Sequence, residues 1–243
     1  MTRVVVVTGG GKGIGKAVVE RFAGAGDRVV AVGRDREALA ATAAAETDVC
    51  DVTDEAAVAA LFERLGRVDV LVNNAGAATS APLGRTTLDD WRALLDVNAT
   101  GAFLCSRSVL GGMVERGEGR IVTVASTAAR AGIPYTAAYT ASKHAAVGLM
   151  RAVAAEVAGT GVTANAVCPT YVRTEMTERS IARIVSVTDR SEEEAEAALI
   201  ASSPLGRLLE PDEVAFAVAF LAAPEAGAIN GQALVLDGGG IQA

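Results

Sequence analysis

The sequence RVVVVTGGGKGIG at residues 3–15 decides the fold. Four consecutive valines at 4–7 are typical of a strand that is buried on both faces of a parallel sheet. A glycine-rich turn follows, and then apolar residues at helical spacing, among them Val18, Val19 and Phe22. Strand, glycine turn and helix together bring a dinucleotide pyrophosphate to a helix N-terminus. Taken alone, the turn also fits a purely structural loop, so the prediction of a dinucleotide site needs support from the rest of the chain.

Short apolar runs alternate with helical patterns along the whole sequence. Strands are expected at 3–8, 28–33, 47–50, 68–73, 120–125, 162–168 and 233–236. This alternation predicts an α/β fold of the Rossmann type, a doubly wound parallel sheet of seven strands with helices on both faces. We interpret residues 1–243 as a single NAD(P)-binding domain. The long charged stretch at 173–208 contains a capping box, Ser191 and Glu194, and is expected to form a small helical lid over the substrate.

Bulk composition excludes several classes of function. With 22 basic and 29 acidic side chains the net charge is -7, which argues against nucleic-acid binding. No apolar stretch approaches the roughly 20 residues of a membrane span, and the first strand begins too close to Met1 for a signal peptide. A cytoplasmic protein is expected. Cys50, Cys105 and Cys168 are scattered and odd in number, so they indicate neither disulfides nor a metal site, and we interpret them as buried apolar residues.

Three residues suggest acid–base chemistry. Tyr139 and Lys143 are four positions apart in YTASK and therefore share one helix face. We expect the ammonium to lower the phenol pKa, which is about 10 when unperturbed, so that Tyr139 exchanges a proton with an alcohol oxygen. Ser126 ends an apolar run and can donate a hydrogen bond to the same oxygen. His144, the single histidine, points about 100° away from Lys143 on a helix, so a structural role is expected for it.

Eight motifs then occur in the order and spacing of one known family. They are TGGGKGIG (8–15), CDVTD (50–54), NNAG (73–76), VN (97–98), Ser126, YTASK (139–143), the segment 169–174 and DGGG (237–240). On these motifs the chain resembles the short-chain dehydrogenases/reductases of the single-domain type. The resemblance implies an NAD(P)-dependent oxidoreductase that interconverts a ketone and a secondary alcohol, and a homotetramer.

The resemblance also implies the functional residues. The catalytic set would be Asn98, Ser126, Tyr139 and Lys143. Lys143 would both tune Tyr139 and hold the nicotinamide ribose, and the Asn98 side chain or its neighbouring carbonyl would help to anchor a water. The cofactor-binding set would be Gly9, Gly11, Lys12, Gly13, Ile14, Arg34, Asp51, Val52, Asn74, Ala75, Gly76, Tyr139, Lys143, Pro169, Val172 and Thr174.

Charge near the second strand bears on the choice of cofactor. The family position that carries an acid in NAD users is Gly33 here, and Arg34 follows it. Lys12 in the glycine turn can reach the same place, and two cations favour the 2′-phosphate of NADP(H). NADP(H) is therefore expected. Asp35 keeps NAD(H) open, since its carboxylate can neutralise Arg34 or bind the ribose.

The sequence indicates the substrate less precisely than the cofactor. Segments 111–122, 125–132, 139–148 and 165–169 are similar to polyketide ketoreductases and 3-oxoacyl thioester reductases, which favours a β-ketoacyl thioester. Fatty-acid-type reductases carry arginines that dock a carrier protein where this chain has Gly117 and Thr160, so a coenzyme A ester or a free cyclic ketone stays open. Thr170 departs from the glycine that usually follows the proline of this segment. The alternatives are a dehydrogenase of free cyclic or aliphatic secondary alcohols that uses NAD(H), and a nucleotide-binding regulator without turnover.

Overall fold

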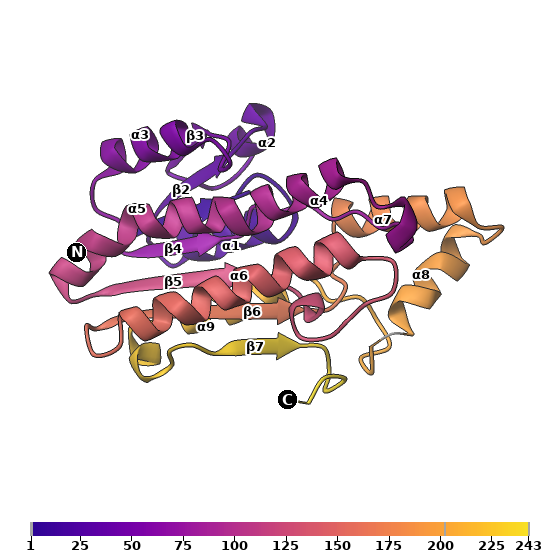
Figure 1. The fold of residues 1–243 in the computed structure, drawn as a ribbon. Coiled ribbons are helices and arrows are strands. Elements are labelled where there is room, and N and C mark those ends of the chain that lie inside the picture. Colours follow the sequence, from indigo (N-terminus) through magenta and orange to yellow (C-terminus); the bar gives the residue numbers. More distant parts are fainter. Residues whose placement is uncertain (1, 202, 243) are drawn as a thin grey trace.

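A parallel sheet of seven strands forms the centre of the molecule in the computed structural model, which describes residues 2–201 and 203–242 (Figure 1). The strands are β1 (Val4–Thr8), β2 (Arg28–Gly33), β3 (Glu46–Val49), β4 (Val70–Asn73), β5 (Gly119–Val124), β6 (Val162–Pro169) and β7 (Ala233–Leu236). Their order is β3-β2-β1-β4-β5-β6-β7, and every pairing is parallel. The predicted doubly wound fold is confirmed, with strand boundaries within two residues of those expected.

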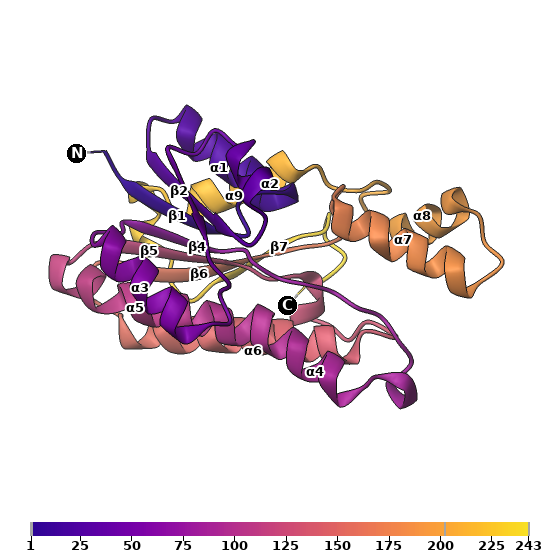
Figure 2. The ribbon, with the colours of Figure 1, turned by 90° about the horizontal axis from the view of Figure 1, so that it is seen from above.

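Helices cover both faces of this sheet. They are α1 (Gly13–Gly24), α2 (Arg36–Ala40), α3 (Glu55–Leu65), α4 (Leu88–Leu95), α5 (Gly101–Arg116), α6 (Ala137–Glu156), α7 (Glu175–Val187), α8 (Glu192–Ile200) and α9 (Pro211–Leu221). Figure 2 shows α1, α2 and α9 on one side of the sheet, and α3, α5 and α6 on the other. Among the described residues, no helix has both the length and the apolar character that crossing a membrane requires.

The valines of β1 explain how one strand serves two cores. Val4 and Val6 belong to the core under α3, α5 and α6, whereas Val5 and Val7 belong to the core under α1 and α9. All four side chains are buried. Each contributes about 1.5–3 kcal/mol relative to an exposed side chain, so an uninterrupted apolar run is the pattern that a central parallel strand needs.

The strand order places a switch point between β1 and β4. The chain proceeds outward from β1 to β2 and β3, and then returns to β4 on the other side of β1. Ligands of such sheets bind outside the carboxyl ends of the strands at this point. Asn74 joins the two strands here, because its backbone N–H donates to Thr8 Oγ1 at 3.0 Å and its Nδ2 donates to the Thr8 carbonyl at 2.9 Å.

Helices α7 and α8 project beyond the carboxyl edge of the sheet (Figures 1 and 2). Both lie inside the range 173–208. The predicted capping box is present at the start of α8, where Glu194 N donates to Ser191 Oγ at 3.2 Å and Ser191 N donates to the Glu194 carboxylate at 2.9 Å. These helices therefore extend over the side of the sheet where the switch point lies.

Candidate active site

Ser126, Tyr139 and Lys143 meet just beyond the carboxyl end of β5. Ser126 caps the short 3₁₀ helix Thr127–Ala129, with its Oγ accepting from Ala128 N at 3.1 Å. Tyr139 lies in the first turn of α6, and its phenol shares a hydrogen bond with Ser126. Lys143 lies one turn further along, with its Nζ 5.9 Å from the centre of the Tyr139 ring. The structure thus brings the three predicted groups together.

The electrostatics of this trio differ from the expectation. Lys143 is buried, which lowers its pKa to about 8, and its Nζ donates to the Val124 carbonyl at 3.0 Å. The pKa of Tyr139 is raised by burial, although the Ser126 hydrogen bond acts in the opposite direction. The expectation that the phenol pKa lies below its ordinary value is therefore wrong for this structure. Loss of solvent around the phenolate dominates, and the ammonium is directed at a backbone carbonyl.

Asn98 fixes the backbone around Tyr139 rather than touching its phenol. It lies in the π-helical segment Asp96–Thr100 and is buried. Its Oδ1 accepts from Ala77 N at 3.0 Å, and its Nδ2 donates to Ala77 O at 3.0 Å and to Ser142 Oγ at 2.9 Å. Ser142 Oγ donates in turn to the Tyr139 carbonyl at 2.8 Å. Since these bonds occupy the Asn98 amide, its neighbouring backbone carbonyl is the better candidate for anchoring a water.

The glycine turn provides a cradle for an anion at the start of α1. Gly13 has φ +50°, and a Cβ there would lie 3.1 Å from Thr174 Cγ2. Lys12 is the N-cap residue; no side chain in the described structure caps the first turn of α1, and that turn contains no acidic residue. The free N–H groups of the first turn of α1 and the positive end of the helix dipole therefore provide a suitable binding site for a pyrophosphate. Asn74 Nδ2 supports the turn by donating to Gly9 O at 3.2 Å.

Two basic side chains lie where the second strand ends, Lys12 and Arg34, and both are paired with carboxylates. Arg34 Nη1 lies 3.6 Å from Asp51 Oδ2. Lys12 Nζ lies 3.1 Å from Asp35 Oδ2 and 3.6 Å from Glu175 Oε2. Asp35 also caps α2 by accepting from Ala38 N at 3.0 Å, which turns its carboxylate toward Lys12 rather than Arg34.

The other predicted cofactor residues follow the ends of β1, β3, β4 and β6. They are Gly11 and Ile14 in the glycine turn and α1, Val52 after β3, Ala75 and Gly76 after β4, and Pro169, Val172 and Thr174 at and after β6. A Cβ on Gly76 would lie 2.6 Å from Asn98 Oδ1 and 3.5 Å from Lys143 Nζ, which places this backbone beside the predicted catalytic groups. The roles of these residues toward a cofactor stay predictions.

Sequence reasoning missed three residues of this region. Ser142 has a local signal, because it stands inside YTASK. Cys168 is buried, as predicted for the cysteines, and also receives a hydrogen bond from the Ser126 backbone. Glu175 has no local signal, because an acidic residue at the start of a helix is ordinary. His144 is exposed, with Nδ1 2.9 Å from the Thr140 carbonyl, which fits the structural role expected for it.

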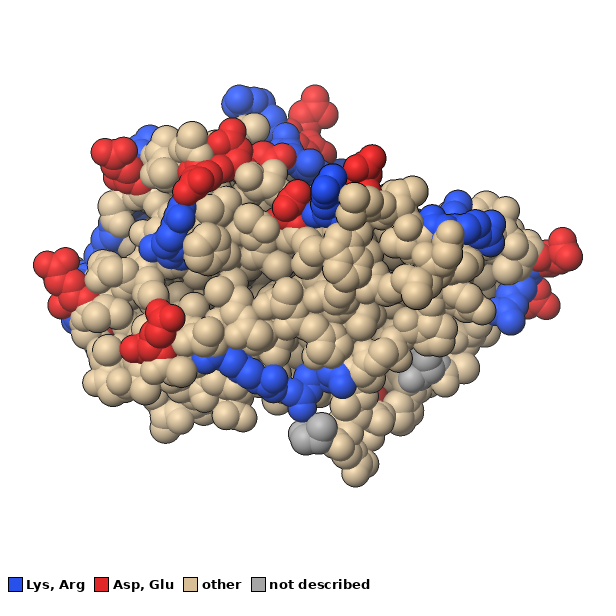
Figure 3. Space-filling view, in the orientation of Figure 1, with Lys and Arg blue, Asp and Glu red and all other residues tan. Residues whose placement is uncertain are grey.

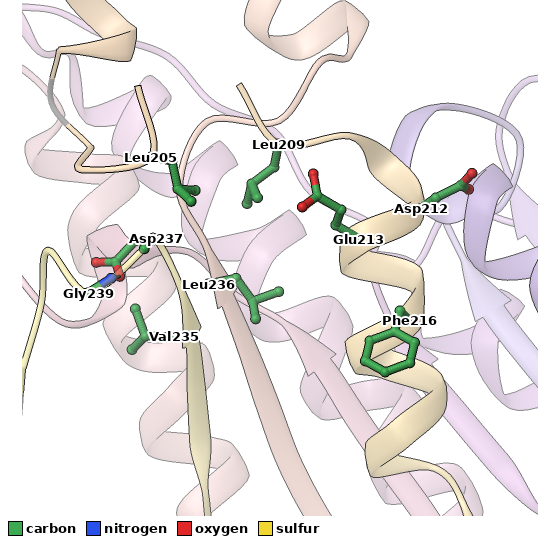
Figure 4. Close-up of a pocket in the computed structure, with 10 residues that line it drawn as sticks. Leu205, Leu209, Asp212, Glu213, Phe216, Val235, Leu236, Asp237 and Gly239 are labelled. Atoms are coloured by element: carbon green, nitrogen blue, oxygen red, sulfur yellow. Dashed lines mark hydrogen bonds between the residues drawn. The ribbon is translucent and has the colours of Figure 1, made fainter. Parts of the chain in front are cut away.

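Two cavities lie outside the catalytic trio. One, of about 650 Å³, lies between α9 and the end of β7, with Phe216, Leu236 and Asp237 on its wall (Figure 4). The other, of about 350 Å³, lies between α7 and α8, where Arg173, Glu178 and Glu196 contribute to its lining. The second is part of the lid, and the first belongs to the outer edge of the sheet.

An acid–base trio beside a cradle for a dinucleotide defines a dinucleotide-dependent oxidoreductase. Comparison with known proteins agrees. A family model described as Enoyl-(Acyl carrier protein) reductase matches residues 9–240. The chain belongs to the short-chain dehydrogenase/reductase family, which confirms the resemblance found in its motifs, and it is an enzyme of the class that acts on ketones and secondary alcohols.

Three relatives illustrate the range of the family. A protein of Streptomyces coelicolor that is assigned as a ketoacyl reductase is 41% identical over 98% of this chain and 97% of its own. D-threitol dehydrogenase of Mycolicibacterium smegmatis is 39% identical over 98% of this chain and 92% of its own. The crystal structure of a single-residue variant of actinorhodin polyketide ketoreductase with NADPH has a TM-score of 0.90 and 40% identity, covering 98% of this chain and 97% of its own.

Replacing Tyr139 with phenylalanine tests the proton donor. Tyr139→Phe removes one oxygen and keeps the ring, so we expect kcat to fall by at least about 100-fold while the cofactor Kd changes by less than about threefold. His144→Gln is the control on the same helix, because His144 is exposed and its ring nitrogen contacts only the Thr140 carbonyl among the described residues. Its kcat should stay within about twofold of the parent enzyme. More than a few per cent of residual turnover in Tyr139→Phe would contradict the assignment.

The pKa of Lys143 predicts a pH profile. Below about pH 8 the ammonium is charged and can stabilise the phenolate that forms as Tyr139 gives up its proton. Above that pH the charge is lost, whereas Tyr139 stays protonated because its pKa is raised. We therefore expect kcat for ketone reduction to be level from about pH 6 to 7.5 and to fall at least about threefold by pH 9.5. Circular dichroism at each pH checks the fold, and a level profile would refute the role of the charge.

Proposed function

We propose that this enzyme is an NADP(H)-dependent ketoreductase whose substrate is a β-ketoacyl thioester. The observation that carries the proposal is the trio Ser126, Tyr139 and Lys143 beside a cradle with two basic residues, Lys12 and Arg34. The relative from Streptomyces coelicolor supports the ketoacyl substrate, and the solved polyketide ketoreductase with NADPH supports the cofactor.

The residues present fit the cofactor along its length. NADP(H), when bound, supplies or accepts the hydride. The open N-terminus of α1 would hold the pyrophosphate, and Arg34 and Lys12 would hold the 2′-phosphate. Asp51 and Val52 would flank the adenine. Asn74, Ala75 and Gly76 would form the floor of the cleft, Lys143 would bind the nicotinamide ribose, and Pro169, Val172 and Thr174 would line the nicotinamide side.

Each residue of the trio then has a different role. Ser126 donates a hydrogen bond to the substrate carbonyl oxygen and stabilises the negative charge that develops there. Tyr139 delivers its proton to the same oxygen, since its phenol already shares a hydrogen bond with Ser126. Lys143, which is mostly charged at pH 7 with a pKa of about 8, stabilises the phenolate left behind. Asn98 and Ser142 hold the Tyr139 backbone in place.

We infer that two loops near the trio would form the walls for an acyl chain. Two loops, at 77–85 and 127–138, are joined by the hydrogen bond from Ala81 N to Tyr135 O at 2.8 Å. Leu83 and Tyr135 are among the most exposed large hydrophobic side chains described, at 75% and 67%. Apolar groups of this kind at a cleft bind an apolar substrate body. With the lid at 173–208, they form part of a single catalytic domain over 1–243.

A second candidate is a dehydrogenase of free secondary alcohols that uses NAD(H). D-threitol dehydrogenase, a relative of similar identity, acts on a free polyol by its name, and Asp35 places a carboxylate beside Lys12. A regulator without turnover is disfavoured, because Ser126, Tyr139 and Lys143 are all present and adjacent.

A substrate panel separates these candidates. NADPH and NADH oxidation are followed with acetoacetyl-CoA and with cyclohexanone, and NADP⁺ and NAD⁺ reduction with the matching alcohols. We expect kcat/KM for acetoacetyl-CoA with NADPH to exceed each alternative pairing by at least about 10-fold. Faster reaction of the cyclic or aliphatic alcohols with NAD⁺ would favour the second candidate. Tight NADPH binding without turnover of any substrate would favour the regulator.

We further propose that the enzyme is a cytoplasmic homotetramer. The three cysteines are free, as in reducing compartments. Two separate faces carry exposed apolar side chains: α5 with Phe103 and Val114, and α9 with β7, which present Phe216, Phe220 and Leu234. Figure 3 shows few charged side chains across the middle of the face on which α5 and α6 lie. Two self-complementary faces are what a tetramer of dihedral symmetry requires.

Light scattering after size exclusion tests this assembly. Phe220→Asp puts a charge on the exposed side of α9, where Phe220 is 47% exposed, so we expect the mass to fall from four chains to two. Leu88→Asp is the control, because Leu88 is 60% exposed but lies on α4. It should leave the mass at four chains. A parent enzyme that elutes as a monomer would contradict the proposal.

A further inference from the structure

Lys12 connects three segments of the chain through ion pairs. Its Nζ lies 3.1 Å from Asp35 Oδ2, at the start of α2, and 3.6 Å from Glu175 Oε2, in the first turn of lid helix α7. Glu175 Oε2 also lies 3.7 Å from Arg179 Nη1, one turn along α7. A row of alternating charges therefore runs from the adenine end of the cofactor cleft into the lid.

The beginning of the lid is packed directly on the glycine turn. A Cβ on Gly13 would lie 3.1 Å from the Thr174 side chain, so the two backbones approach closely. On the other side, Arg173 reaches Glu210 at 3.1 Å and Glu196 of α8 at 3.7 Å. Glu175 thus extends from a segment that is held in place, and its carboxylate is the group through which α7 forms an ion pair with the glycine turn.

We propose that Glu175 is a specificity-determining residue, because its carboxylate competes with the 2′-phosphate of NADP(H) for Lys12. The inference rests on the proposed function, in which Lys12 binds that phosphate. NAD(H) lacks the phosphate and leaves the Lys12–Glu175 pair intact. Cofactor choice and attachment of the lid are therefore coupled through one ammonium group, and by linkage each affects the other to the same extent.

The two carboxylates next to Lys12 are not equivalent. Asp35 is fixed, since its other oxygen accepts from Ala38 N at 3.0 Å and caps α2. Glu175 has only ionic partners among the described residues, and one of them, Arg179, moves with the same helix. A phosphate monoester carries about −1.5 to −2 charges near pH 7. When the 2′-phosphate binds beside the two carboxylates, charge repulsion therefore favours movement of one carboxylate away from Lys12. Glu175 is the one free to leave.

The exposure of these groups makes such an exchange feasible. The side chains of Lys12, Asp35 and Glu175 are each about half exposed, at 51%, 51% and 52%. Ion pairs at such positions contribute little to stability and are screened by salt. The expected effect is therefore a change of severalfold in affinity rather than the loss of binding.

Cofactor titrations measure this competition. NADPH and NADH affinities are determined from nicotinamide fluorescence for the parent enzyme, Glu175→Gln and Glu178→Gln. Glu178→Gln is the matched control, because Glu178 is exposed on the same helix and forms no ion pair within the described part of the chain. We expect Glu175→Gln to tighten NADPH binding by about 3- to 10-fold at about 50 mM salt, with NADH changed less than twofold, and the gain to shrink at about 500 mM salt.

The control should change neither affinity by more than about twofold. The inference is overturned if Glu175→Gln tightens NADPH binding no more than Glu178→Gln does, or tightens NADH binding equally.

Lys12→Met separates this inference from the proposed function. If Lys12 binds the 2′-phosphate, its removal should weaken NADPH binding by about 10-fold or more and spare NADH. In the Lys12→Met variant, Glu175→Gln should then change the NADPH affinity no more than Glu178→Gln does. Unchanged NADPH affinity in Lys12→Met would refute the cofactor assignment of Lys12. Weakened NADPH affinity in Lys12→Met, together with no effect of Glu175→Gln in the parent, would leave that assignment standing and refute the competition.

Discussion

Parallel pairing of all seven strands is the constraint on which the rest of this molecule depends. A strand buried on both faces needs helices above and below it, and each crossover returns the chain to the same starting edge. Every strand therefore ends at one edge, which is why Gly9, Asp51, Asn74, Ser126 and Thr174 all lie along that edge although they are far apart in the sequence. The bond from Asn74 to the Thr8 carbonyl joins the two strands at the switch point and supports the glycine turn beside it.

The fold could be predicted from the sequence because its signals are local. The four valines of β1, the glycine turn and the spacing of Tyr139 and Lys143 each reflect a short-range rule. The pKa of Tyr139 could not be predicted in this way. Its direction depends on burial, which the hydrogen bond with Ser126 offsets only in part, and both are tertiary features. The ion-pair partner of Asp35 also depends on tertiary structure, because the cap that Asp35 forms on α2 orients its carboxylate. Glu175 comes close to Lys12 only when the lid packs on the glycine turn.

Burial acts in opposite directions on the two titratable groups of the trio. It raises the pKa of the Tyr139 phenol and lowers that of the Lys143 ammonium to about 8, because both charged forms lose solvent. At neutral pH the site therefore holds a protonated phenol and an ammonium close to its titration point. A protonated phenol is the form that reduction of a ketone consumes, whereas oxidation of an alcohol needs the phenolate. Near neutrality the trio thus already carries the proton that ketone reduction consumes.

The two ends of the proposed cofactor cleft are built from different kinds of interaction. Around Tyr139, buried hydrogen bonds from Asn98 through Ser142 leave few alternative arrangements, which suits groups that must keep their geometry during a reaction. Around Lys12, half-exposed ion pairs can exchange partners at small cost. Changes at the first end therefore affect turnover. Under the proposed function, changes at the second would affect which dinucleotide is bound, so cofactor preference could vary while the acid–base trio stays the same.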